Sequence, residues 1–98
     1  MLTNTSSIED IIDVESLSVF PNPVSDRVNV NFNVKESDNV RIELINLLGS
    51  KMISDDLGFL NGNSYRHTMN VNTLPEGLYI ISISAGESVV TRKVQIVR

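Results

Sequence analysis

The 98-residue chain has no cysteine, no tryptophan and a single histidine. The lack of cysteine excludes disulfides, thiolate zinc sites and a thiol nucleophile. The chain also has no run of about 18 apolar residues that could cross a membrane as a helix. Its first 16 residues lack the basic and apolar regions of a signal peptide. If the domain is exported, we therefore expect it to travel as part of a longer protein.

Alanine, the best helix former, occurs once, whereas Val, Ile and Thr make up 27 of the 98 residues. This composition is typical of β-structure. With 41% apolar residues, the chain has material for one hydrophobic core, and a chain of this length forms one domain.

The net charge of −4 is unevenly distributed. Four acidic residues and no basic ones fall in residues 1–20, so residues 21–98 are neutral. A neutral domain with eight basic residues and five aromatic ones lacks the basic stripe of a nucleic-acid-binding protein. We interpret residues 1–16 as an acidic linker. The alternative is a short amphipathic helix with its apolar face at Ile8, Ile11, Ile12 and Val14.

From residue 17 onward, apolar residues alternate with polar ones in short segments separated by turn residues. The clearest segment has Val28, Val30, Phe32 and Val34 on one face and Asn29, Asn31 and Asn33 on the other. The pattern predicts seven strands, at residues 17–20, 27–34, 40–44, 51–57, 64–71, 78–85 and 88–97. The Asp38-Asn39 pair predicts the turn before the third strand, and broken alternation near Ile45 predicts a bulge there.

No segment between these strands has the helical period that a parallel crossover needs, so the strands should pair antiparallel. Seven short antiparallel strands predict an all-β, immunoglobulin-like sandwich over residues 17–98. The Cys…Trp…Cys core of antibody domains is absent.

Few residues could carry catalysis. His67 alternates with Tyr65 and Met69, which predicts a half-buried core or edge histidine rather than a base. Asp55 and Asp56 are adjacent on a strand and should point to opposite faces; in a loop they could join Asn61 or Asn63 around calcium, but the spaced acidic ligands of a calcium loop are missing. We expect no enzyme, metal or cofactor.

Two features instead concern the shape of the surface. In the segment Leu74-Pro75-Glu76-Gly77-Leu78-Tyr79, a proline and a glycine precede an apolar strand, which is typical of a turn. The final strand carries Arg92, Lys93 and Arg98 without any acid, as edge strands often do to resist aggregation.

Three signals occur together in the chain: Leu17-Ser18-Val19-Phe20-Pro21-Asn22-Pro23, Leu74-Pro75-Glu76-Gly77-Leu78-Tyr79, and Arg92-Lys93-Val94-Gln95-Ile96-Val97-Arg98. In this order, they resemble the C-terminal sorting domain of the type IX (Por) secretion system of Bacteroidetes, in its β-sandwich type. The resemblance covers residues 17–98 and includes Ile45-Asn46-Leu47-Leu48-Gly49. Phe20 and Asn70 stand where the family often has Tyr and Asp.

The resemblance implies the C-terminal domain of a larger secreted protein, which the outer-membrane secretion machinery recognises after transit through the periplasm. A sortase would then cleave in or before residues 1–16, and the cargo would be attached to the cell surface or released. By position, the sorting motifs would be Pro21, Asn22, Pro23, Leu74, Pro75, Gly77, Tyr79, Arg92, Lys93, Val94 and Arg98. The final strand would be the main recognition element, and its edge could also pair in a dimer of the isolated domain.

Two alternatives to sorting stay open at this point. One is a sandwich module that binds carbohydrate or mediates adhesion. Such modules usually display aromatic rings for stacking on sugars, whereas Phe32 and Tyr79 alternate as core residues. The other is a spacer without a partner.

Overall fold

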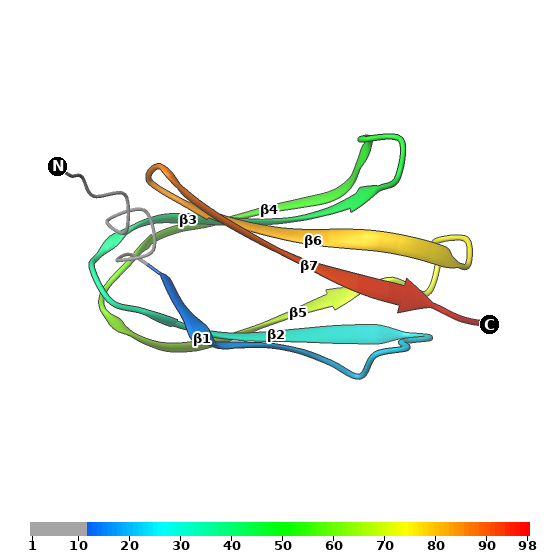
Figure 1. Cartoon of the computed structure of the whole chain (residues 1–98), viewed down its shortest axis with the longest axis horizontal. Helices are drawn as coiled ribbons and strands as arrows, with labels where there is room; N and C mark the ends of the chain where they lie inside the picture. The colour runs from blue at the N-terminus through cyan, green and yellow to red at the C-terminus, as the bar shows by residue number, and fades with distance from the viewer. Residues whose placement is uncertain (1–11) are drawn as a thin grey trace, which may run out of the picture.

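The computed structural model describes residues 12–98, which form two packed β-sheets (Figure 1). The strands are β1 (Ile12–Phe20), β2 (Arg27–Val34), β3 (Asp38–Asn46), β4 (Lys51–Leu60), β5 (Asn63–Asn70), β6 (Gly77–Ala85) and β7 (Ser88–Ile96). One sheet has the order β1-β2-β5 and the other β4-β3-β6-β7. Every ladder between these strands is antiparallel. The all-β sandwich prediction is therefore confirmed.

The strand order is close to that of an immunoglobulin constant-type domain, in which the fourth strand lies in the same sheet as the first two. Here β4 instead pairs with β3, so that the sheets hold three and four strands. Residues 12–98 contain no helix long and apolar enough to cross a membrane.

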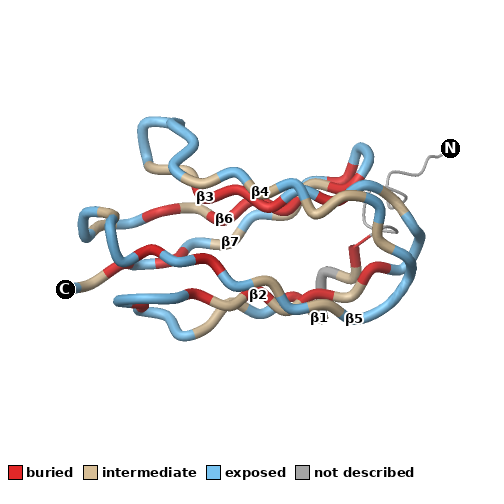
Figure 2. The backbone as a smooth tube through the Cα atoms, turned by 180° about the vertical axis from the view of Figure 1, so that it is seen from behind, coloured by how far each residue is buried: buried red, intermediate tan, exposed pale blue. Residues whose placement is uncertain are grey.

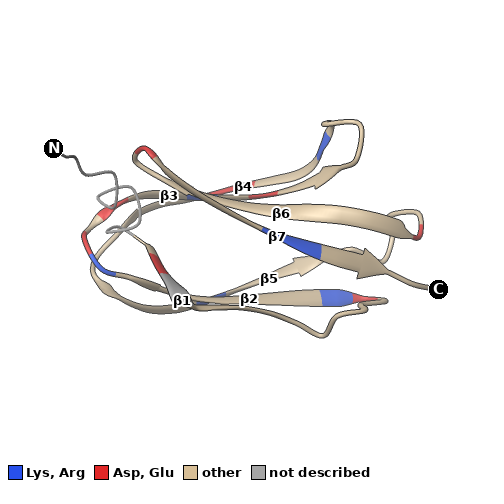
Figure 3. Ribbon diagram, in the orientation of Figure 1, with Lys and Arg blue, Asp and Glu red and all other residues tan. Residues whose placement is uncertain are grey.

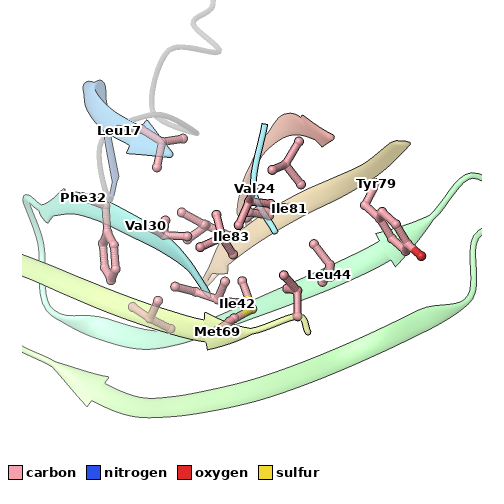
Figure 4. Packing of buried hydrophobic residues seen from close by; sticks show 14 of the residues in the cluster. Leu17, Val24, Val30, Phe32, Ile42, Leu44, Met69, Tyr79, Ile81 and Ile83 are labelled. Carbon is pink, nitrogen blue, oxygen red and sulfur yellow. The ribbon is translucent and has the colours of Figure 1, made fainter. Parts of the chain in front are cut away.

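The core fills the space between the sheets, as the buried inner positions in Figure 2 and the packed side chains in Figure 4 show. In β2 the predicted alternation is complete: Val28, Val30, Phe32 and Val34 are all buried. The ring of Phe32 stacks on Tyr65, with 5.7 Å between ring centroids. On the outer face, Asn29 accepts a hydrogen bond from the Thr68 hydroxyl at 2.7 Å. β2 thus has an apolar inner face and a polar outer face.

The first strand begins at Ile12, five residues earlier than predicted. Ile12 pairs with Val34 and is fully buried. The register shifts between Asp13 and Ser18, where the Ser16 hydroxyl donates to the Asp13 carbonyl and accepts from the Asn33 amide. Because this irregular pairing breaks the period-two pattern, the sequence pattern predicted a linker rather than a strand over residues 12–16. The helix alternative is wrong from Ile12 onward, and residues 1–11 lie outside the described part.

The third and fourth strands are also longer than predicted. Asp38 and Asn39 do not form a turn but begin β3, and they pair with Leu60 and Phe59 at the end of β4. The register shift predicted near Ile45 is present between Leu44 and Ile45. Asp38 and Asn39 are tolerated in the strand because they lie at the end of the sandwich. There, strand pairing depends on cross-strand hydrogen bonds and not on the burial of apolar side chains.

Glu43 lies on the outer face of the four-stranded sheet, yet its side chain is only 10% exposed. Burial raises the pKa of its carboxyl, but the hydrogen bond from the Ser54 hydroxyl (2.9 Å) and the Lys51 ammonium (3.2 Å) outweigh it. The pKa of Glu43 is therefore below its ordinary value of 4.5.

A lowered pKa means that the ionised form of Glu43 stabilises the folded state. This contribution is complete above the ordinary pKa of 4.5 and is lost as the pH falls through the lower pKa of the folded state. We expect Glu43→Gln to lower the free energy of unfolding more at pH 7 than at about pH 3. Urea titrations of both proteins at the two pH values measure this, and an equal difference at both would contradict it.

Candidate functional site

The segments that carry the predicted sorting motifs meet at one end of the sandwich, the end where the C-terminus lies in Figure 1. Three backbone hydrogen bonds join them: Val24 N–H to the Gln95 carbonyl (2.8 Å), Val97 N–H to the Val24 carbonyl (2.9 Å), and Val71 N–H to the Asp26 carbonyl (2.8 Å). We call this region, formed by residues 21–26, 71–79 and 92–98, the motif end. The three motif segments, which lie far apart in the sequence, are therefore neighbours in the fold.

The Pro21-Asn22-Pro23 segment lies in the connection between β1 and β2, two strands of the same sheet, and leads into a contact with the other sheet. Proline has no N–H to donate, so the ladder between β1 and β2 ends at Phe20. Both X–Pro bonds in this segment are cis. Beyond it, Val24 is buried and forms an isolated parallel bridge with Ile96 of β7. The segment thus connects the three-stranded sheet to the edge of the four-stranded one.

The Asn22 side chain caps the edge of β7 next to this bridge. Its amide nitrogen donates to the Lys93 carbonyl (3.2 Å), and its oxygen accepts from the Gln95 N–H (3.0 Å). An asparagine side chain carries one amide, so it can replace one peptide unit of a neighbouring strand. Residues 93–97 of β7 are therefore already paired on the edge that the sequence suggested for a partner strand.

The Leu74–Tyr79 motif has an architectural role. The Tyr79 hydroxyl donates to the Pro75 carbonyl at 2.7 Å, and the ring is 5% exposed. Gly77 has a φ of 151°, which side chains disfavour. A tyrosine near the start of the sixth strand that bonds back to the preceding connection is the tyrosine corner of immunoglobulin-like sandwiches. The motif thus fixes the β5–β6 connection against the start of β6.

Arg98 ties these segments together. Its guanidinium donates to the carbonyls of Val71 (2.7 Å) and Leu74 in the β5–β6 connection. It also donates to the Ser25 carbonyl in the β1–β2 connection. The backbone N–H of Arg98 donates to a Glu76 carboxylate oxygen at 3.3 Å. The planar guanidinium has donors in several fixed directions, so that one side chain can hold two connections.

The basic residues of β7 do not form one patch, although Figure 3 shows them side by side along the ribbon. Arg92 pairs with Ile81 on the inward side and is half-buried, whereas Lys93 pairs with Ile80 and is exposed. The sequence suggested one basic surface on the final strand, but adjacent strand residues point to opposite faces. Val94 is buried in the core. Among Arg92, Lys93 and Val94, only Lys93 therefore presents its side chain to the outer face.

On the opposite side of the sandwich, His67 of β5 faces Asp55 of β4. Their side chains meet at 2.7 Å and are 21% and 38% exposed. Because β5 and β4 are edge strands of different sheets, this contact joins the sheets. His67 is thus a half-buried edge histidine, as predicted. Asp56 points the other way, to Arg41 at 3.4 Å. Within residues 12–98, no three His, Asp or Glu side chains gather as a metal site would require.

Sequence comparison adds an independent result. A family model described as "Secretion system C-terminal sorting domain" matches residues 18–97. No curated protein matches the chain. The match includes all of the motif segments except Leu17 and Arg98, and it covers most of the described sandwich. The chain therefore belongs to the family of C-terminal sorting domains that direct proteins to the type IX secretion system.

Proposed function

We propose that the motif end is the surface by which the outer-membrane secretion machinery recognises this domain, and that the cargo before it is then cleaved off and displayed or released. The main support is the meeting of all three motif segments at one end of the sandwich. Asn22, Pro75 and Lys93 are exposed there. These residues are brought together only in the folded domain, so recognition would require that the sorting domain is folded.

The buried motif residues have a different part in this proposal. Tyr79 and Val94 are 5% and 1% exposed, so that neither presents much surface to a partner. They hold the exposed residues in place by packing. Recognition would therefore depend on Tyr79 and Val94 through stability, and on Asn22 and Lys93 through contact.

Sortase cleavage would fall before Ile12. A protease binds its substrate as an accessible, extended segment, whereas Ile12 is fully buried and paired with Val34. Cleavage after Ile12 would require the first strand to detach. The sequence predicted cleavage in or before residues 1–16, and the proposal narrows this region to residues 1–11 or the cargo before them.

The carbohydrate-binding alternative gains no support from the aromatic residues. Phe32 and Tyr79 are buried, Tyr65 stacks on Phe32, and the Arg66 guanidinium lies 5.3 Å from the ring centroid of Phe20. Of the five aromatic residues, only Phe59 is largely exposed, at 64%. Stacking on a sugar chain usually uses more than one such ring.

A reporter fused upstream of residues 1–98, behind a signal peptide, tests the proposal in a host with a type IX system. We expect the reporter on the cell surface or in the medium, with a C-terminus that maps before Ile12. The same reporter without residues 1–98 is the control and should stay in the periplasm. Equal retention of both would overturn the proposed function. A terminus within the sandwich would overturn only the cleavage region.

The edge-strand dimer of the isolated domain stays a prediction. Pairing through residues 93–97 of β7 would have to displace Asn22 and Val24. Sedimentation of residues 1–98 at increasing concentration measures whether the dimer forms.

A further inference from the structure

The outer face of the four-stranded sheet has a mainly polar half, which also includes the exposed Val89 opposite Ser84, and an apolar half. In the polar half, Glu43 lies between Ser54 and Ser82 on the neighbouring strands, and Arg41 lies between Asp56 and Ser84. In the half next to the motif end, Ile45 lies opposite Ile80. Leu78 lies one same-face position further along β6 and is 39% exposed. Leu47 is the first residue of the β3–β4 turn, directly after Asn46, and is 64% exposed. Outer sheet faces are usually polar, so this apolar half needs an explanation.

The β3–β4 turn extends this apolar surface beyond the sheet, where the hairpin projects from the rest of the sandwich in Figure 1. Leu48 in the turn is 91% exposed. We call Ile45, Leu47, Leu48, Leu78 and Ile80 the outer patch. Single exposed leucines are common on proteins, but a group of apolar side chains on one face is typical of an interaction surface.

The turn holds its leucines in a defined conformation. The Asn46 side-chain oxygen accepts hydrogen bonds from the N–H groups of Leu48 (3.0 Å) and Ser50 (2.9 Å). The Asn46 backbone donates to the Ser50 carbonyl and accepts from Gly49, both at 3.0 Å. Gly49 has a φ of 90°. Apolar side chains on a turn ordered in this way lose less conformational freedom on binding, which favours affinity.

The charges around the outer patch indicate the kind of partner. Lys51 is neutralised by Glu43 at 3.2 Å, and Asp56 is paired with Arg41 at 3.4 Å. Lys93, which lies opposite Ile80, forms no ion pair with any acidic side chain that the structure describes. The patch is thus apolar, with a positive charge at its border that none of these described acids pairs. It complements an aliphatic surface that carries a carboxylate.

Resting on the proposed function, we propose that the outer patch is a docking surface for a protein of the secretion machinery, one with an aliphatic surface bordered by a carboxylate. The patch is continuous with the motif end, since Leu78 lies between Gly77 and Tyr79 and Lys93 adjoins the Asn22 contact. A second copy of the chain fits less well. A two-fold contact would have to supply a carboxylate to each Lys93, and the acids that flank this face, Glu43 and Asp56, are already paired.

The test uses the reporter fusion with two double variants. Leu47→Ser with Leu78→Ser removes two exposed apolar side chains of the outer patch. Val89→Ser with Phe59→Ser removes two others, at 57% and 64% exposure, away from it, and serves as the control. We expect surface delivery to fall about tenfold for the first variant and to stay at the wild-type level for the second. Melting temperatures of the purified domains should stay close to that of the wild type for both.

Lys93→Glu and Lys93→Arg test the charge separately. We expect Lys93→Glu to reduce delivery more than it lowers the melting temperature, and Lys93→Arg to deliver normally. Wild-type delivery by the Leu47→Ser, Leu78→Ser variant would overturn this inference while the proposed function stands; retention of the wild-type fusion would instead overturn the proposed function.

Two other results would also overturn the docking inference. One is a wild-type dimer that the Leu47→Ser, Leu78→Ser variant dissociates without any loss of delivery, which would make the outer patch a contact between copies. The other is binding of the domain to anionic lipid vesicles that the same variant abolishes, again without loss of delivery.

Discussion

Replacing Tyr79 by alanine is expected to lower the free energy of unfolding by about 3–5 kcal/mol, the usual cost of removing a buried aromatic ring. The ring is 5% exposed, and the hydroxyl bonds to the Pro75 carbonyl at 2.7 Å. Small domains are stable by about 5–15 kcal/mol, so this loss is a large part of the total. We therefore expect much of the Tyr79→Ala protein to be unfolded at growth temperature and its reporter fusion to be retained in the periplasm.

Tyr79→Phe is the matched control, because it keeps the ring and removes only the hydroxyl. Its expected cost is about 0.5–1.5 kcal/mol, the net value of one hydrogen bond. Urea denaturation of both variants measures the two losses. If Tyr79→Phe were as destabilising as Tyr79→Ala, the corner hydrogen bond rather than the ring would hold the motif in place, and our assignment of its main role to packing would be wrong.

Replacing Arg98 by alanine is expected to lower the free energy of unfolding by about 1–3 kcal/mol and to reduce surface delivery. The change removes hydrogen bonds from a charged group to the carbonyls of Ser25, Val71 and Leu74. The two connections at the motif end would then be free to separate. Arg98→Lys keeps the charge but not the planar set of donors, so it should recover only part of both losses.

Chemical denaturation and the reporter fusion measure the two effects of Arg98→Ala. A wild-type denaturation curve for Arg98→Ala would show that the hydrogen bonds of the Arg98 side chain contribute nothing to stability. Deleting residues 88–98 is a less informative experiment. It also removes the buried side chains of Val94 and Ile96, so retention of the deleted protein would reflect unfolding as well as lost recognition.

The strands were predictable where one face is buried throughout. In β2 and β6 each inward position is apolar, and both strands were predicted to within about one residue. The start of β1 was not predictable, because the irregular pairing between Asp13 and Ser18 breaks the alternation that the prediction relies on. The start of β3 was missed because Asp38 and Asn39 are residues that usually form turns.

The candidate site was predictable as a set of residues but not as an arrangement. Pro21, Asn22 and Pro23 were recognised as a motif, yet no local pattern indicates that the Asn22 amide bonds to β7, more than 70 residues later in the chain. Arg92 and Lys93 were treated as one basic feature, whereas the pleat of β7 places Arg92 inward and Lys93 outward. The outer patch was not predicted, because Leu47 in the β3–β4 turn and Leu78 in β6 come from segments far apart in the chain.

By itself, the sequence determined the class of fold, the family and most of the core, since each of these depends on composition, on period-two alternation or on motifs that are local in the chain. Only the tertiary structure decided which motif residues are buried and which are exposed, and that the first strand includes Ile12. It also decided that three distant segments share one end of the sandwich. The physical reason is that pairing between segments far apart in sequence depends on register and on specific hydrogen bonds, which no single segment encodes.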